Sequence, residues 1–351
     1  MSNGDLPICS ERSCTSCSFH DQCMDAYGVG CHIAVGRCMV DGETWHVDGS
    51  VEKGDGSAMA PFPNINQALA HIDPEQEGTI ILHEFMINGM EGNYDEAISI
   101  RDGKTVAILA NEFERPKITP SSNNDLVRAT DTTTFFYLQG VRVQDPNNTG
   151  IHITSGATTT LDQCEIITND NYGLISTGGS SLVMRNSTIW SNYNLATRST
   201  VRIANSASAD ISYSTIINAH SNSDTTDISC HNALETSIRN SIFISSNNEP
   251  GSFGCPNASI TNSAGTGIPP NNGNFIIDNY GNPPFDDEHI TELFLNPTGP
   301  SLEEIDLRLS ARGATMLSNI AIRQQADLPF DIDGDPRPPV GSPDYPGADV
   351  P

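Results

Sequence analysis

The stretch Met184-Arg-Asn-Ser187-Thr-Ile189 recurs with variations every 22 to 27 residues between about Phe136 and Gly265. The other copies are Leu138-Gln-Gly-Val141-Arg-Val143, Leu161-Asp-Gln-Cys164-Glu-Ile166, Ile211-Ser-Tyr-Ser214-Thr-Ile216 and Ile238-Arg-Asn-Ser241-Ile-Phe243. A period this short, built from strand-forming residues without helix formers, predicts a solenoid of stacked β coils.

Each copy is predicted to place a bend between two short strands whose apolar side chains point inward. The second bend residues are Gly140, Gln163, Asn186, Tyr213, Asn240 and, in a weaker sixth copy, Asn262. Glycine and asparagine tolerate a left-handed backbone, so Gln163 and Tyr213 do not suit such a corner. We expect one wall of the core to consist of Ile166, Ile189, Ile216 and Phe243. Beside it we expect a row of smaller, hydrogen-bonded side chains, namely Val141, Cys164, Ser187, Ser214 and Ser241.

The composition excludes some partners. The chain has 351 residues, with 44 acidic against 17 basic side chains and a net charge of −27. This charge repels phosphate backbones and anionic membrane surfaces, so nucleic-acid binding is not expected. The sequence also has no apolar run long enough to span a bilayer, so we expect no transmembrane segment.

Six of the nine cysteines lie close together near the start of the chain: Cys9, Cys14, Cys17, Cys23, Cys31 and Cys38. Such density predicts a small module held by disulfides in an oxidising compartment, with its pairing left open. Zinc is the alternative, because Cys14 and Cys17 lie near His20, Cys23 and His32. Met1 to Pro7 lacks the features of a signal peptide, and we expect the numbered chain to begin after a removed leader.

A short helix is predicted after the cysteine-rich head. Asn64 and Gln67 resemble a capping box, and Ile65, Ala68, Leu69 and Ile72 share one face. We expect this helix to cover the open end of the solenoid. The first coils are expected at 79–82, 98–100 and 106–109, which divides the chain into a head (1–44), a β-helix with its capping helix (45–325) and a tail (326–351).

Three stretches resemble known families. The run from Pro61 to Leu109, including Ile98-Ser-Ile-Arg-Asp-Gly-Lys-Thr-Val, resembles the beginning of bacterial right-handed parallel β-helix proteins of the pectin-lyase-like superfamily. The tail Asp331-Ile-Asp-Gly-Asp-Pro-Arg-Pro338, together with 273–276 and 305–309, is similar to the last coils and ending of choice-of-anchor Q domains. The head is similar to cysteine-rich modules of exported myxobacterial proteins. The resemblance implies a right-handed parallel β-helix located outside the cell or on its surface, and no chemistry.

No constellation in the sequence identifies a reaction. Neighbouring coils would place Asp162 beside Arg185 and Arg142 beside Glu165, which could be a base and its carboxylate partners. We interpret both as exposed cross-strand ion pairs worth under about 1 kcal/mol. The paired-aspartate and Gly-His-Gly signatures of hydrolases with this fold are missing, as is a lyase-type Arg-x-Pro-x-x-Arg. Lone histidines such as His83 and His152 have no spacing that suggests metal.

Asp331, Asp333 and Asp335 in the tail are weak candidates for calcium ligands, since hard cations favour clustered carboxylates. Turn formation by the Asp-Gly and Asp-Pro steps is the preferred interpretation. We expect no other cofactor.

The loops that lengthen along the solenoid are the predicted binding surface. Stacked coils commonly bind through their loop-bearing faces. The candidate residues, expected on one side of the molecule, are Tyr193, Asn194, His220, Asp224, Asp227, His231 and Asn232. Cys230 and Cys255 are one coil apart and are predicted to form a disulfide that clamps these loops, whereas Cys164 should stay a buried thiol.

The sequence therefore predicts an exported, cell-surface or secreted β-helix module that binds a polysaccharide or another cell-surface component, or has a structural or adhesive role. The alternative is a polysaccharide lyase that acts on acidic glycans.

Overall fold

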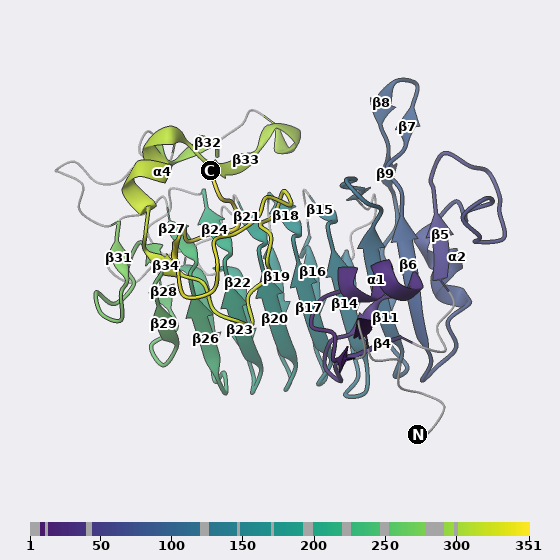
Figure 1. The fold of residues 1–351 in the computed structure, drawn as a ribbon, viewed down its shortest axis with the longest axis horizontal. Helices are drawn as coiled ribbons and strands as arrows, with labels where there is room; N and C mark the ends of the chain where they lie inside the picture. Colours follow the sequence, from purple (N-terminus) through teal and green to yellow (C-terminus); the bar gives the residue numbers. More distant parts are fainter. Residues whose placement is uncertain are drawn as a thin grey trace.

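The protein is a right-handed parallel β-helix of three sheets (Figure 1), here seen in a computed structural model. The structure describes residues 8–10, 13–39, 44–119, 126–145, 148–169, 172–191, 199–219, 226–245, 253–277, 291–297 and 301–351. No helix in these ranges has the length and apolar character needed to cross a membrane.

The strands follow one another around the coil from the first sheet to the second and then to the third. The first sheet contains β5 (Thr44–Val47), β6 (Glu77–Leu82), β11 (Thr105–Ala110), β14 (Phe135–Gln139), β17 (Thr158–Asp162), β20 (Ser181–Arg185), β23 (Ser208–Ser212), β26 (Thr236–Arg239) and β29 (Ser259–Thr261). The second sheet contains β9 (Asn93–Tyr94), β12 (Lys117–Ile118), β15 (Arg142–Asp145), β18 (Glu165–Thr168), β21 (Thr188–Ser191), β24 (Thr215–Asn218), β27 (Ile242–Ser245), β30 (Ala264–Gly265) and β31 (Phe275–Ile276). The third sheet contains β10 (Ile98–Ile100), β13 (Val127–Ala129), β16 (Ile151–Ile153), β19 (Leu174–Ser176), β22 (Ser199–Ala204), β25 (Thr226–His231) and β28 (Phe253–Gly254).

The strand register confirms the predicted repeat. In the first sheet the aligned core residues are Leu138, Leu161, Met184, Ile211 and Ile238. In the second sheet the predicted wall from Ile166 to Phe243 is aligned and fully buried. The period of the sequence thus fixes both the coil length and the inward face.

All six bend residues have a left-handed backbone, including the two that the sequence disfavours. The φ angle is 54° at Gln163 and 47° at Tyr213. Both side chains are held by the C-terminal tail: Gln163 Nε2 donates to the Asp331 carbonyl oxygen (2.6 Å), and the Arg337 guanidinium lies 3.8 Å from the centre of the Tyr213 ring. These tertiary contacts offset the local strain, so the expectation from residue type alone was wrong at these two positions.

The row of small residues beside the wall forms a hydrogen-bonded ladder, as predicted. Ser214 Oγ accepts from the Ser187 amide (3.4 Å) and donates to the Ser212 carbonyl (3.0 Å). The same two bonds recur at Ser241, and at the start of the ladder Ser187 Oγ accepts from the Cys164 amide (3.1 Å). Each buried hydroxyl therefore has both a donor and an acceptor as partners, which removes the cost of burying it.

Helix α2 (Ile65–Ala70) covers the N-terminal end of the solenoid, and the Asn64 side chain caps it by accepting from the Gln67 amide (2.9 Å). Its apolar face packs into the main core with Ile72. The sequence did not predict the short helices α1 (Asp21–Tyr27) and α4 (Ala311–Leu317) or the 3-10 turn η1 (Leu302–Glu304).

The cysteine-rich head lies against the outer face of the first sheet. It contains the strand pairs β1 (Ile8–Ser10) with β2 (Ser13–Thr15) and β3 (Cys31–His32) with β4 (Arg37–Cys38). Met39 packs on Ala107, Leu109 and the fully buried Tyr137. The Tyr137 hydroxyl lies 2.8 Å from His32 Nδ1, so the head is joined to the coils by polar as well as apolar contacts.

The C-terminal segment covers the outer face of the second sheet. Ile167, Trp190 and Ile217, which point outward from the coils, are buried in a separate cluster with residues from 293–317. This segment contains the antiparallel pairs β32 (Phe294–Asn296) with β33 (Asp306–Leu309) and β34 (Ala321–Ile322) with β35 (Pro343–Asp344). Residues 305–309 are therefore not a last coil, contrary to what the family resemblance implies, because β33 pairs antiparallel outside the solenoid.

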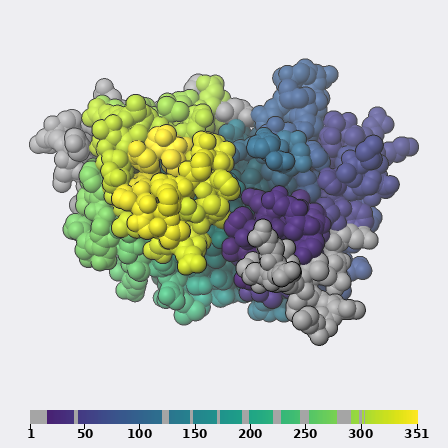
Figure 2. Space-filling model, viewed as in Figure 1, coloured from purple at the N-terminus to yellow at the C-terminus, as the bar shows by residue number. Residues whose placement is uncertain are grey.

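The tail and the head lie side by side on one face of the molecule (Figure 2). Phe19 and Asp21 of the head and Leu328 and Phe330 of the tail line one small gap. Elsewhere, β7 (Met86–Ile87) and β8 (Met90–Glu91) form a hairpin that projects from the coils (Figure 1). The domain boundaries predicted from the sequence remain predictions.

Candidate functional site

The third sheet keeps its whole outward row accessible, whereas the outward rows of the other two sheets are covered in part. Its outward row runs in register along the solenoid through Ser99, Arg128, His152, Ile175, Arg202, Ser229 and Gly254. Every residue of this row is partly or fully exposed, whereas Tyr137 and Ile217, in outward positions of the other sheets, are fully buried. We call this row the open face.

The open face collects positive charge in a strongly acidic protein. Arg128 and Arg202 are three coils apart, which corresponds to about 14 Å at the usual spacing between strands. The Arg202 guanidinium lies 6.0 Å from the centre of the Tyr172 ring, and its Nη1 donates to the Tyr172 hydroxyl (3.4 Å). Together these side chains offer hydrogen-bond donors and one half-buried aromatic ring to an elongated ligand.

The predicted loop residues are only partly within the described chain. Tyr193, Asn194, His220 and Asp224 lie outside the described residues. Asp227 belongs to β25, a strand of the third sheet, and its side chain is likewise outside the description.

His231 and Asn232 are exposed at the C-terminal end of β25, at the turn that leads to β26. Asp227 lies near the other end of this six-residue strand, roughly 13 Å from His231 along the chain. Asp227 and the pair of His231 and Asn232 therefore do not lie at one corner. Asn232 also has a left-handed φ of 54°, and its carbonyl accepts from the Ser206 amide, which is a turn-forming role.

The pair Asp162 and Arg185 is buried, which corrects the expectation of an exposed ion pair. Arg185 donates to both carboxylate oxygens of Asp162 at 2.7 and 2.5 Å, and also to the Ser18 carbonyl of the head at 3.2 Å. The head covers this pair, so Asp162 is 1% exposed and cannot act on a ligand. Its role is to hold the head against the coils.

The second predicted pair contributes to a polar cavity of about 400 Å³ between the second sheet and the C-terminal segment. Arg142 Nε donates to Glu165 (2.6 Å), which also pairs with Arg115. The two guanidinium groups hold the pKa of Glu165 below its usual value despite burial. Arg115 in turn lies 3.5 Å from Asp333 and donates to the Ile332 carbonyl (2.6 Å), so the network fastens the tail to the coils.

Asp331 acts as a turn organiser. Its Oδ1 accepts from the Asp333 and Asp335 amides at 2.9 and 2.8 Å, and its Oδ2 accepts from the Val350 amide at 2.9 Å. Both carboxylate oxygens of this fully buried residue are therefore occupied by backbone donors. This geometry is the turn that the Asp-Gly step favours, and the carboxylates of Asp331, Asp333 and Asp335 do not converge on one point.

Asp349, which lines the same cavity, is predicted to make the stability of the protein depend on pH. Burial, with the charges of Asp331 and Asp333, raises its pKa to about 6, although it accepts a hydrogen bond from the Leu309 amide. A raised pKa means that the folded state favours the protonated carboxyl, so its contribution to stability is lost as the pH rises from about 4 through 6. We expect Asp349→Asn to raise the melting temperature by a few degrees at pH about 8 and to leave it unchanged at pH about 4. Thermal scans across this range test the difference, with the exposed Asp335→Asn as control; an equal shift at both pH values would contradict it.

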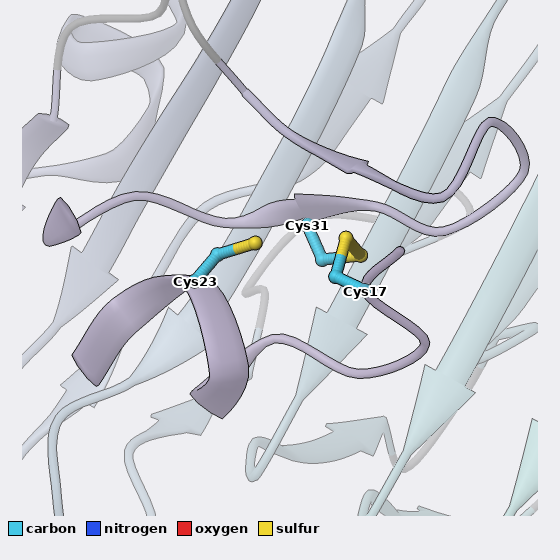
Figure 3. Close-up of side chains that lie close together, drawn as sticks. All are labelled: Cys17, Cys23 and Cys31. Atoms are coloured by element: carbon cyan, nitrogen blue, oxygen red, sulfur yellow. A yellow bond between two sulfur atoms is a disulfide. The ribbon is translucent and has the colours of Figure 1, made fainter. Parts of the chain in front are cut away.

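Four cysteines of the head form two disulfides. Cys17 bonds to Cys31 and Cys23 to Cys38, and Cys9 and Cys14 face each other in the register of β1 and β2. Cys17, Cys23 and Cys31 lie close together because the two disulfides are adjacent (Figure 3). The histidines of the zinc alternative are engaged elsewhere: His20 Nδ1 accepts from the Cys31 amide (3.0 Å), and His32 contacts Tyr137. The disulfide interpretation agrees with this structure.

The disulfide between Cys230 and Cys255 is present, with Cα atoms 4.7 Å apart. Cys164 is a buried thiol, and burial raises its pKa to about 12. Cys230 lies within β25 and Cys255 directly after β28, so the bond joins two neighbouring coils at the third sheet and not at the tips of long loops.

The open face was missed from the sequence because its residues lie outside the repeated motif. Arg128, His152, Ile175 and Arg202 are 24, 23 and 27 residues apart, close to the period of the repeat. The spacing of these four residues therefore indicated the open face. Using this indication would have required predicting a third strand in each coil. The short Val127–Ala129 and Ile151–Ile153 segments give little local evidence for such a strand.

Comparison with known proteins adds little. A solved structure described as "Crystal structure of pectate lyase Pel9A" is 13% identical to this chain, and the match covers 88% of this chain and 97% of that one with a TM-score of 0.41. At that score the similarity supports no functional argument. No family model matches the chain, and no curated protein matches it. The fold assignment rests on the strand register of the chain itself.

Proposed function

We propose that this protein is an exported β-helix module that binds an extended acidic carbohydrate along the open face of its third sheet. The observation that carries the proposal is the in-register row from Arg128 to Arg202, which stays accessible along its length, whereas the head and the C-terminal segment cover parts of the outer faces of the other two sheets.

Charge and geometry support an acidic polymer. Arginine forms strong, directional hydrogen bonds with carboxylates, and this row holds two arginines in a chain with only 17 basic residues. The strand spacing is comparable to the length of one sugar residue, so a chain parallel to the solenoid axis could contact successive coils. The Tyr172 ring adds a surface against which a sugar ring can pack.

The disulfides support a location outside the reducing cytosol. Two disulfides lie in the described part of the head, and a further bond joins neighbouring coils. Such bonds persist in oxidising compartments. An exported position is also where a polysaccharide or another cell-surface component would be met.

The proposal predicts that Arg128→Gln and Arg202→Gln each weaken binding about tenfold, or roughly 1.4 kcal/mol. Because the two sites are about 14 Å apart, the double variant should lose about a hundredfold. The measurement is calorimetric titration with a uronic-acid oligosaccharide and with its neutral counterpart. Lys53→Gln, which removes an exposed positive charge elsewhere, is the matched control.

Equal binding by the double variant and the unaltered protein would refute the proposal, as would preference for the neutral sugar. The same titration addresses the lyase alternative. If ultraviolet absorbance from unsaturated products grows with time and depends on Arg128 or Arg202, the protein is a lyase that acts on the same ligand class.

A further inference from the structure

Two histidines that are 37 residues apart in the sequence face each other at the N-terminal end of the first sheet. His46 lies in β5, and His83 directly follows β6, the strand paired with β5. The distance between His46 Nδ1 and His83 Nε2 is 3.1 Å, and the two rings are nearly parallel, with 24° between their planes. The fold thus creates a pair that the sequence spacing does not suggest.

The backbone holds both residues firmly. The His83 amide donates to the Val47 carbonyl (2.9 Å), and the amide and carbonyl of His46 bond to Gly56 and Phe62 (both 2.8 Å). The Tyr94 hydroxyl lies 2.7 Å from the His83 carbonyl oxygen and 2.9 Å from that of Val47. The rings can therefore turn about their side-chain bonds while their Cα atoms stay in place.

The carboxylate of Glu114 lies next to the ring of His83. Glu114 Oε2 lies 3.8 Å from His83 Nδ1, on the side of the ring away from His46. Glu114 is itself fixed, because Oε2 accepts from the Glu84 amide (2.7 Å) and Oε1 accepts from Asn111 Nδ2 (2.8 Å). A carboxylate behind a histidine is the usual outer partner of a metal-binding imidazole, since it orients the ring and raises its basicity.

From this arrangement we propose that His46 and His83 form a binding site for a divalent transition-metal ion, supported by Glu114. Two metal–nitrogen bonds of about 2.0 to 2.1 Å at a tetrahedral angle separate the nitrogens by roughly 3.3 Å, close to the observed separation. The ion takes the place of the proton shared between the rings, and each ring turns about its side-chain bonds so that both nitrogen lone pairs point at the ion. His83 and Glu114 are about a quarter exposed, so solvent can complete the coordination.

Imidazole ligands select the class of ion. They suit copper, nickel and zinc, whereas calcium and magnesium prefer oxygen. We expect one Cu²⁺ ion per chain to bind most tightly, Ni²⁺ and Zn²⁺ more weakly, and Ca²⁺ not to depend on the pair.

The test is calorimetric titration of the oxidised full-length chain with each metal salt alone. His46→Gln and His83→Gln are expected to weaken Zn²⁺ binding at least a hundredfold, and Glu114→Gln about tenfold. His71→Gln and His231→Gln, which alter exposed histidines elsewhere, should leave it unchanged. The electron paramagnetic resonance spectrum of bound Cu²⁺ should show two imidazole nitrogens, and one fewer in either single variant.

Circular dichroism without metal shows whether each variant is folded. The melting temperature gives a second readout of binding. We expect zinc to raise it in the unaltered protein and to have no such effect only in the His46 and His83 variants. Absence of binding, or binding that persists in folded His46→Gln and His83→Gln, would overturn the proposal and leave the pair as a simple hydrogen bond. Neither result bears on the open face, which lies on a different sheet.

Discussion

Replacing Arg337 with methionine is expected to lower the free energy of unfolding by about 3 to 5 kcal/mol. Arg337 Nη1 lies 3.3 Å from Asp344, and neither side chain of the pair is accessible to solvent. Methionine has a similar size but no charge, so the change leaves the Asp344 carboxylate buried without its partner. An unpaired buried charge is among the most destabilising outcomes of a single substitution.

Arg337 also joins the tail to the row of bends. Its Nη2 donates to Asn186 Oδ1 and to the Gly347 carbonyl, both at 3.0 Å, and its guanidinium stacks on Tyr213. The substitution should therefore release the tail from the coils before the coils unfold. Hydrogen exchange of tail amides such as those of Ile332 and Ala348 would report this local opening.

Urea unfolding gives the magnitude, with Arg312→Met as the matched control because Arg312 is half exposed and should change stability by under about 0.5 kcal/mol. The double variant Arg337→Met with Asp344→Asn should recover part of the loss, since it also removes the stranded charge. A loss below about 1 kcal/mol in the single variant would show that the buried pair does not hold the tail.

Removing the Cys230–Cys255 disulfide by a double change to serine is expected to cost about 3 kcal/mol. The bond closes a loop of 25 residues, and its loss frees that loop in the unfolded chain. Melting temperature under non-reducing conditions measures the effect. Cys164→Ser is the control, because it should join the serine ladder through the same two bonds that Ser187 makes and change little. If the double variant has the same melting temperature as the unaltered protein, the disulfide is either not formed or not stabilising.

The repeat made the coils predictable. Leu138 to Ile238 and Ile166 to Phe243 recur at one period, and a one-residue error in register would turn each side chain outward, so the pattern specifies the alignment. The serine ladder followed from the same alignment. The one-coil spacing of Cys230 and Cys255 likewise predicted their bond.

Features that depend on non-repeated segments could not be predicted in the same way. The burial of Asp162 and Arg185 depends on where the head docks, and the left-handed backbone of Tyr213 depends on Arg337 of the tail. The pair of His46 and His83 depends on β5, a strand of four residues that joins the coils from the end of the head. In each case the partner is distant in sequence and carries no periodic signal.

The most direct test of the open face is a map of arginine accessibility. The protein would be treated with an arginine-specific reagent, with and without a saturating uronic-acid oligosaccharide, and each modified residue quantified by mass spectrometry. We predict that the ligand protects Arg128 and Arg202, while Arg312, which is half exposed on helix α4 away from the third sheet, reacts equally in both samples. Protection of Arg308 in the cavity, without protection of Arg128 and Arg202, would contradict the account.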